Sequence, residues 1–242
     1  MVLQLLQLGR ISYLEGLSLM REVVDARKAG RIADTLLLME HPPVLTLGRN
    51  SSRANILATD AALAQRGVEI HEINRGGDVT YHGPGQLVGY PIFDLRGDLP
   101  GKKGPHLGPV DFVRLMEEAI ILTCKDFGVS TQRVPKRTGV WTIPGGSIRE
   151  KKVAAIGVHV SQAVTSHGFA LNVTTDLRDF NWIVPCGLTD VGVTSLELEA
   201  PEGTAVSLSL ASNSAARNFG RVFSRQVVAS ETLDDLLSVA AG

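Results

Sequence analysis

Apolar side chains recur at helical spacing in two long stretches of the chain. The first stretch predicts a helix over residues 12–28 and carries Tyr13, Leu17, Met20 and Val24 on one stripe. The second predicts the most regular helix, over residues 110–127, and carries Val113, Met116, Ile120, Cys124 and Phe127. Weaker patterns predict further helices over residues 60–66 and 213–228.

Short apolar or alternating runs between these helices predict strands. They cover residues 35–40, 44–47, 68–73, 86–95, 139–143, 152–161 and 167–173. Residues 97–109 hold four glycines and three prolines, which is typical of a loop. Because the strands cluster centrally with mostly hairpin-like connections, the pattern favours an α+β fold with a mixed, largely antiparallel sheet flanked by helices.

Charge and composition exclude several classes of protein. The 24 basic and 25 acidic residues give a net charge of −1, which argues against general binding to nucleic acid or to a membrane surface. No apolar run approaches the roughly 20 residues of a membrane span, and the N-terminus does not resemble a secretory signal. The two cysteines fit a reducing compartment, and the six histidines form no metal-binding motif. We therefore expect one cytoplasmic, monomeric domain over residues 1–242, without a metal.

Residues 75–86, RGGDVTYHGPGQ, combine backbone freedom with many polar groups. Four glycines in twelve residues permit positive φ and a close backbone approach to a ligand. A guanidinium, a carboxylate, a hydroxyl, a phenol, an imidazole and an amide are interleaved with them. The segment favours a binding loop over the alternative, a bulged hairpin in which Arg75 and Asp78 form an exposed pair.

The two cysteines have different surroundings. Cys124 falls on the apolar stripe of the predicted helix 110–127, where a thiol acts as a small buried hydrophobe. Cys186 lies in a proline-glycine corner that can present a side chain at a loop tip, although on this pattern alone a half-buried loop thiol fits better. A nucleophilic thiol needs a partner, because an unperturbed cysteine is mostly protonated at pH 7.

Lys152 is a candidate for that partner. It precedes the small-residue run of the predicted strand 152–161, and an ammonium group beside a thiol lowers the thiol pKa. The alternative is an edge-strand lysine that prevents pairing with another chain. Sequence spacing alone does not show that residues 152 and 186 meet.

Four ordered blocks resemble the octanoyltransferases of lipoate synthesis, also called lipoyl(octanoyl) transferases. They are RGGDVTYHGPGQ (75–86), KVAAIGV (152–158), HGFALNV (167–173), and PCG (185–187) with VTSL (193–196). The resemblance extends from about residue 36 to residue 196, and the region after about residue 201 matches nothing specific. Residues 142–151 form a longer stretch than in many members of the family.

The resemblance implies a fold, a reaction and partners. The fold is the catalytic domain shared with biotin and lipoate protein ligases. The reaction moves an octanoyl group from octanoyl-acyl carrier protein through a cysteine thioester to a lysine of a lipoyl domain, without a cofactor. Implied acceptors include the glycine cleavage H protein and the E2 subunits of 2-oxoacid dehydrogenases.

The resemblance also implies site residues. Cys186 matches the nucleophile, and Lys152, rather than Lys151, matches the lysine that activates it. His82 and His167 are expected to form pocket walls or to orient groups rather than to act as general bases. The implied acyl pocket is lined by Arg75, Gly76, Gly77, Asp78, Val79, Thr80, Tyr81, His82, Ala155, Ile156, Gly157, His167, Gly168, Phe169 and Ala170.

A local excess of basic residues suggests a docking surface for an acidic carrier protein. The single acid Glu150 stands among Arg133, Lys136, Arg137, Arg149, Lys151 and Lys152. A solvated loop is the alternative interpretation of this stretch.

Two other functions remain open at this point. An ATP-dependent lipoate or biotin ligase would share the fold but would have no need of Cys186. A non-enzymatic acyl- or cofactor-binding module would form no covalent adduct with an octanoyl donor.

Overall fold

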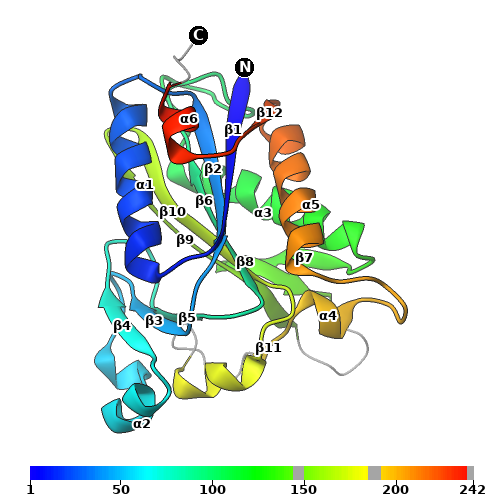
Figure 1. Cartoon of the computed structure of the whole chain (residues 1–242). Helices are drawn as coiled ribbons and strands as arrows, with labels where there is room; N and C mark the ends of the chain where they lie inside the picture. The colour runs from blue at the N-terminus through cyan, green and yellow to red at the C-terminus, as the bar shows by residue number, and fades with distance from the viewer. Residues whose placement is uncertain (144–149, 185–191, 239–242) are drawn as a thin grey trace.

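A mixed β-sheet runs through the middle of the molecule, with helices on both of its faces (Figure 1). The computed structural model describes residues 1–143, 150–184 and 192–238. Within these ranges the main sheet has nine strands, in the order β12-β1-β2-β6-β10-β9-β8-β7, and β11 pairs with β9. Strands β2, β6, β10, β9, β8 and β7 are successively antiparallel, whereas β12, β1 and β2 are parallel. The predicted α+β class with a largely antiparallel sheet is confirmed.

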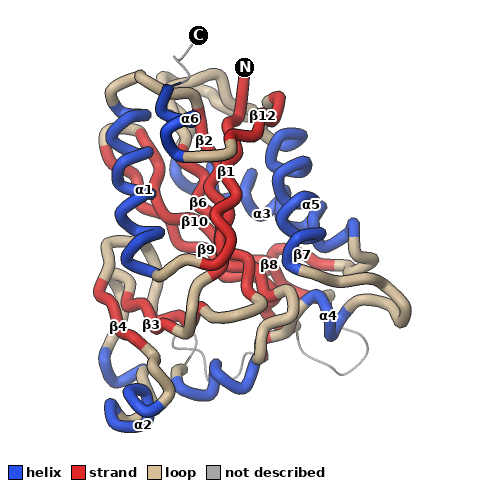
Figure 2. The backbone as a smooth tube through the Cα atoms, in the orientation of Figure 1, coloured by secondary structure: helices blue, strands red, loops and turns tan. Residues whose placement is uncertain are grey.

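The strands of the main sheet differ in length and are ordered here by position across the sheet. They are β12 (Gln226–Ser230), β1 (Val2–Arg10), β2 (Asp34–Glu40), β6 (Gln86–Ile92), β10 (Val164–Asn172), β9 (Lys151–Ser161), β8 (Arg137–Thr142) and β7 (Thr131–Val134). The short strand β11 (Gly192–Val193) stands outside this order and pairs with the start of β9. A smaller sheet places β3 (Val44–Leu47) between β4 (Glu69–Glu72) and β5 (Val79–His82). The tube in Figure 2 shows this small sheet below α1 and beside the end of the main sheet.

Each face of the main sheet has its own helices. Helices α1 (Tyr13–Lys28) and α6 (Leu233–Ser238) cover one face, and α3 (Pro109–Asp126) and α5 (Leu208–Val222) cover the other. The shorter helices α2 (Asp60–Gln65), α4 (Leu196–Glu199), η1 (Arg53–Asn55) and η2 (Leu177–Trp182) lie around the small sheet and the end of β9. None of the described helices is long and apolar enough to cross a lipid bilayer.

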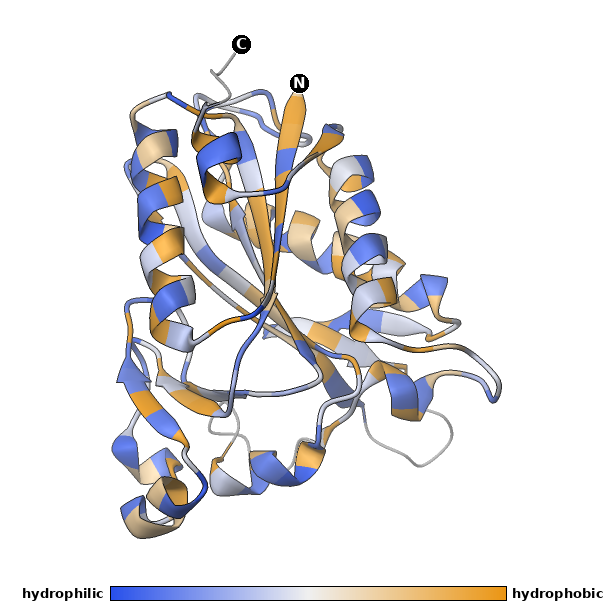
Figure 3. Cartoon of the chain, in the orientation of Figure 1, coloured by the Kyte–Doolittle hydropathy of each residue, from blue (hydrophilic) through white to orange (hydrophobic). Residues whose placement is uncertain are grey.

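Helix α1 forms where the spacing predicts it. The Ser12 hydroxyl accepts a hydrogen bond from the Glu15 amide at 3.2 Å, so a side chain satisfies one of the amides left over at the helix N-terminus. The predicted stripe of α1 is buried against the sheet. Figure 3 shows the resulting pattern, with apolar residues on the central strands and polar residues on the outward faces of the helices.

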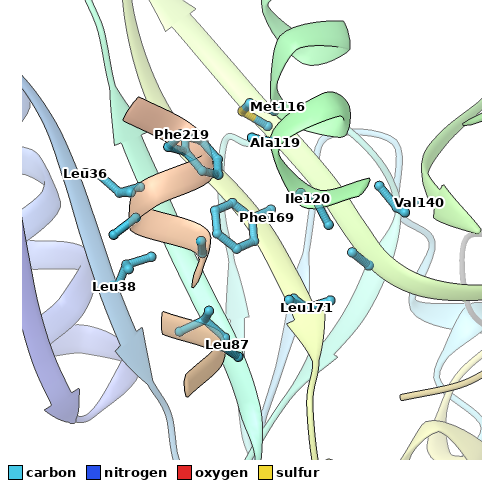
Figure 4. Packing of buried hydrophobic residues seen from close by; sticks show 14 of the residues in the cluster. Leu36, Leu38, Leu87, Met116, Ala119, Ile120, Val140, Phe169, Leu171 and Phe219 are labelled. Atoms are coloured by element: carbon cyan, nitrogen blue, oxygen red, sulfur yellow. The ribbon is translucent and has the colours of Figure 1, made fainter. Parts of the chain in front are cut away.

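Aromatic side chains fill the core between the sheet and helices α3 and α5 (Figure 4). Phe219 of α5 stacks on Phe169 of β10 with 5.3 Å between ring centroids. Met116 and Ile120 of α3 approach the same core from the side of β8. Cys124 is fully buried there, and burial raises the pKa of its thiol to about 12, so its predicted role as a small hydrophobe is confirmed.

The structure differs from the sequence predictions in several places. Strand β1 was not predicted, and the predicted strands 35–40 and 44–47, which follow each other in the sequence, enter different sheets. The binding loop 75–86 contains a strand of its own, β5. The predicted helix 213–228 lies earlier, because Ser207 caps α5 and the chain turns at Ser224, which has φ of 54°, before entering β12.

Phe219→Ala tests the stacked core. Removing a fully buried phenyl ring leaves a cavity, so we expect a loss of about 3–5 kcal/mol in the free energy of unfolding, measured by urea denaturation. The control is Leu210→Ala on the same helix, whose side chain is 46% exposed and whose loss we expect to stay within about 0.5 kcal/mol. Equal losses in the two variants would contradict this description of the core.

Candidate active site

A cavity of about 450 Å³ lies between the main sheet and the small sheet. Its lining comes from separate parts of the chain: the start of α1, Asn50, the segment 73–80 with His82, strand β6, strand β8 with the turn before it, and the facing strands β9 and β10. Of the fifteen residues expected in the pocket, thirteen border this cavity, and Gly76 and Tyr81 do not.

Small residues form the floor of the cavity. In the antiparallel pair β9–β10, Ala155 lies opposite Ala170 and Gly157 opposite Gly168. Ile156 and Phe169 also border the cavity, but their side chains pack in the core under α3 and α5 on the opposite face of the sheet. The alternation of the two strands therefore gives one face to the core and leaves a shallow trough on the other.

The loop before β5 closes over one end of this trough. The Gly76 amide donates to the Val158 carbonyl at 3.0 Å, and the Asn50 amide donates to the Gly77 carbonyl at 3.1 Å. A side chain at Gly157 would stand 2.6 Å from the Gly76 carbonyl oxygen, so glycine is required for this close approach. Gly76 thus attaches the loop to β9 instead of lining the pocket, which corrects its predicted place.

Arg75 is buried in the wall of the cavity and does not form an exposed pair with Asp78. Its Nη2 donates to both the carbonyl and the hydroxyl of Thr46 at 2.9 Å. The Asp78 carboxylate instead accepts from the Asn55 side-chain amide and from the Val79 backbone amide, each at 2.7 Å. The alternative of a bulged hairpin with an exposed Arg75–Asp78 pair is therefore wrong.

Tyr81 points away from the cavity, which is a second correction. Alternation along β5 turns Thr80 and His82 toward the cavity and Tyr81 toward η2. The Tyr81 ring packs edge-on against Trp182 at 5.7 Å, and its hydroxyl donates to Asp179 at 2.7 Å.

His82 is a neutral imidazole with an assigned tautomer. Gln86 donates its Nε2 to the Asn172 Oδ1 at 2.9 Å, so its Oε1 faces the His82 Nδ1 at 2.8 Å. Because an amide oxygen only accepts, Nδ1 carries the proton. Burial lowers the pKa of His82 to about 3.

His167 is held in a similar neutral state. Its Nε2 lies 2.7 Å from the Asn74 Oδ1, and its φ of 56° is the left-handed conformation. Burial, followed by the charge of Arg75, lowers the pKa of His167 to about 3. Neither imidazole is therefore charged at neutral pH.

Two buried tyrosines complete the deep side of the cavity and were not predicted as site residues. Tyr13 stacks on His82 with 6.1 Å between centroids, and burial raises its pKa to about 12. Tyr90 borders the cavity from β6, and burial raises its pKa well above the usual value. The sequence pattern predicted that Tyr13 is buried on the apolar stripe of its helix, but not that it borders the cavity.

Lys152 lies at the other end of the trough. Its side chain is buried, and its Nζ lies 4.7 Å from the centre of the Trp141 ring, over the aromatic face. Lys151 turns outward, where its Nζ lies 3.2 Å from Glu199. Because Lys152 pairs with Trp141 of β8 on one side and with Val193 of β11 on the other, it is not an edge-strand lysine, and that alternative is wrong.

Cys186 lies outside the described residues, as does Arg149, but the chain on both sides of residue 186 is described. Before it, the Val184 amide donates to the Asn55 carbonyl at 2.8 Å. After it, Val193 pairs with Lys152 in the sheet, and the Thr194 amide donates to the Lys152 carbonyl at 2.9 Å. The flank after residue 186 thus pairs with Lys152, which borders the cavity. The flank before it contacts Asn55, which is hydrogen-bonded to the cavity residue Asp78.

The stretch expected to be a basic docking surface is largely paired with acids. Arg133 reaches Glu118 at 2.7 Å, and Arg137 reaches Glu150 at 2.9 Å. With Lys151 also paired to α4, the local excess of positive charge is smaller than the sequence suggested. Glu150 belongs to the stretch itself, whereas Glu118 and Glu199 come from α3 and α4.

The fold and the cavity together define the class of the protein. Residues 12–214 match the family described as the lipoyl protein ligase A/B catalytic domain. An octanoyltransferase of Acidobacterium capsulatum is 66% identical over 98% of this chain and 96% of that protein. One of Koribacter versatilis is 52% identical over 98% of this chain and 90% of that protein. The chain belongs to the octanoyltransferase family and is an acyltransferase.

Solved structures confirm the fold. A bipartite lipoate protein ligase from Thermoplasma acidophilum superposes with a TM-score of 0.69 at 18% identity, covering 98% of this chain and 91% of that one. A lipoate-protein ligase A bound with ATP gives a TM-score of 0.68 at 17% identity, covering 98% of this chain and 93% of that one. The expected likeness to lipoate ligases is confirmed at the level of fold.

The depressed histidine pKa values predict a loss of stability in acid. The unfolded chain binds protons below about pH 6.5, whereas folded His82 and His167 bind them near pH 3, so stability falls as the pH is lowered. We expect His82→Gln to reduce the drop in unfolding free energy between pH 7 and pH 5 by about 1–2 kcal/mol. The exposed His106→Gln serves as the control, and an unchanged drop in the His82 variant would refute the prediction.

Proposed function

We propose that this octanoyltransferase accepts its acyl group from octanoyl-acyl carrier protein, holds it as a thioester on Cys186, and passes it to a lysine of a lipoyl domain. Transfer of an octanoyl group in lipoate biosynthesis is the reaction of its family. The single observation that carries the proposal is the trough of small residues that leads to the Lys152 ammonium.

The dimensions of the trough support an eight-carbon chain. Lys152 and Gly157 are five residues apart on β9, a distance of about 16 Å at about 3.3 Å per residue. An octanoyl chain has seven carbon–carbon bonds of about 1.5 Å, so it spans less than about 11 Å. The chain fits between the Lys152 end and the loop that closes at Gly157.

Lys152 would supply proton transfer to both half-reactions. In the first, Lys152 holds the Cys186 proton as an ammonium, the Cys186 thiolate attacks the donor thioester carbon, and the donor thiol leaves with the proton from Lys152. In the second, the acceptor amine attacks the Cys186 thioester, the now neutral Lys152 takes the amine proton, and the Cys186 sulfur leaves as a thiolate beside the restored Lys152 ammonium. A thioester is exchanged for an amide, so the transfer needs no nucleotide.

The described flanks of residue 186 support this pairing. Val184 is two residues before Cys186, and Val193 is paired with Lys152 itself. The oxyanion of each tetrahedral intermediate needs N–H donors, but the Gly76 amide already donates to Val158. Gly77 and the backbone around Gly187 remain as candidate donors.

Lipoyl domains are the acceptors that fit this family. The archaeal ligase of the same fold was studied with its E2 lipoyl domain. We extend the proposal to the glycine cleavage H protein and to the E2 subunits of 2-oxoacid dehydrogenases, each of which would present a lysine at the mouth of the cavity.

Narrowing the trough tests where the acyl chain lies. Ala155→Leu fills space between Lys152 and Gly157, so we expect kcat/KM to fall at least tenfold with an octanoyl donor and much less with a butanoyl donor. Transfer rates with the two carrier-bound donors measure the ratio. An equal loss with both donors would place the chain elsewhere.

Intact-mass measurement after mixing with octanoyl-acyl carrier protein tests the thioester. We expect one octanoyl adduct on the parent enzyme and on Cys124→Ser, and no adduct on Cys186→Ala. The adduct should form slowly on Lys152→Met and at the parent rate on Lys151→Met. Omitting ATP should change nothing. An adduct that persists without Cys186 and disappears without Cys124 would overturn the assignment, and an absolute need for ATP would favour a ligase.

A further inference from the structure

A shift in strand register determines which face of the sheet carries Lys152. Ala155 and Gly157 face the cavity, so simple alternation would turn Val153 to the cavity and Lys152 to the helical core. Instead, Val140 pairs with Ala154 and Trp141 with Lys152, so one step on β8 matches two steps on β9. Val153 and Ala154 are both in the core, and Lys152 borders the cavity. This is a β-bulge that re-aims a side chain.

Gly139, immediately before the shifted pair, makes room for Lys152. Its φ of 123° is a conformation that other residues rarely adopt. A side chain there would stand 2.6 Å from the Ala154 carbonyl oxygen and 3.5 Å from the Lys152 Cε. The stem of Lys152 therefore packs close to the position that a Gly139 side chain would occupy.

A buried carboxylate holds Gly139 from the other side of the sheet. Glu117 of α3 is fully buried, and an ionised group in the protein interior is costly unless it is paired. Its Oε2 accepts from Arg114 at 2.6 Å and lies 3.2 Å from Arg133. Its Oε1 accepts from the Gly139 amide at 3.1 Å. Both arginines therefore contact one carboxylate oxygen of Glu117, and the other oxygen accepts from the backbone next to the bulge.

We propose that Glu117 is a positioning residue for Lys152, because it fixes Gly139 and with it the bulge that turns the Lys152 side chain into the cavity. Glu117 does not touch the acyl chain or the reacting atoms. The proposal rests on the proposed function only in giving Lys152 a role in catalysis. The arrangement of Glu117, Gly139 and Lys152 can be tested independently of that role.

Carbon-13 labelling of the lysine ε-carbons provides the structural test. The chain has seven lysines, and the Lys152 signal should be displaced upfield by the Trp141 ring and identified by its absence in Lys152→Arg. We expect the displacement to be lost in Glu117→Met. It should be retained in Glu117→Gln, which keeps an oxygen acceptor, and in Arg114→Met, which removes only an ion-pair partner. A displacement that persists in Glu117→Met would overturn the proposal.

Kinetics separate positioning from a general loss of stability. Well below the melting temperature of every variant, we expect Glu117→Met to lower kcat on the order of tenfold or more, with KM for the octanoyl donor within twofold of the parent value. Arg114→Met should lower the melting temperature without lowering kcat. Proportional losses of kcat and melting temperature in both variants would indicate a purely structural ion pair.

Gly139→Ala tests the same link from the cavity side and serves if Glu117→Met does not fold. Its methyl group conflicts with the Ala154 carbonyl, so we expect the same loss of the displaced signal and of kcat while Glu117 is intact. A parent-like signal and rate would contradict the proposal. If Lys152→Arg transferred octanoyl at the parent rate, the proposed role of Lys152 would fail, and the labelling result would still decide whether Glu117 positions it.

Discussion

Strand β9 borders the helical core on one face and the cavity on the other. The β-bulge at Val153 determines that Lys152 lies on the cavity face. From Ala155 onward its alternate side chains face the cavity and the helical core, as in any regular strand. The shift at Val153 reverses this assignment for Lys152, which then enters a trough otherwise floored by alanine and glycine. The proposed chemistry requires this reversal, because an amine on the core face would be separated from any acyl group by the sheet itself.

The remaining polar groups of the cavity are arranged to stay uncharged or to face structural partners. His82 and His167 are neutral through burial, and Tyr13 keeps its proton for the same reason. The Arg75 guanidinium donates hydrogen bonds to the carbonyl and the hydroxyl of Thr46 on β3. A cavity with these walls suits an acyl chain that brings no hydrogen-bonding groups of its own except at its thioester end.

Patterns within single segments predicted a large part of the fold. The stripes of α1 and α3 and most central strands follow from local spacing, because each of these elements buries one face against the same sheet. The burial of Cys124 followed from its place on the stripe. The small sheet was not predicted, since β3 pairs with β4 and β5 across long intervening segments and no local pattern indicates these contacts.

The site was predictable from the sequence only in part, for reasons that depend on distant contacts. Simple alternation along residues 152–161 gives Lys152 the wrong face, and only pairing with β8 corrects it. Tyr81 was assigned to the pocket with its neighbours, although the alternation of β5 turns it away. The excess charge of the basic stretch is smaller than predicted because Glu118 and Glu199 approach from α3 and α4, which lie outside the stretch.

The central claim is that Lys152 and Cys186 share one electrostatic environment at the end of the trough. The most direct measurement is the pH dependence of the rate at which iodoacetamide alkylates Cys186, determined on a Cys124→Ser background. Removal of the nearby ammonium in Lys152→Met should move the midpoint to higher pH, while Lys151→Met leaves it unchanged. The same midpoint in all three proteins would contradict the account.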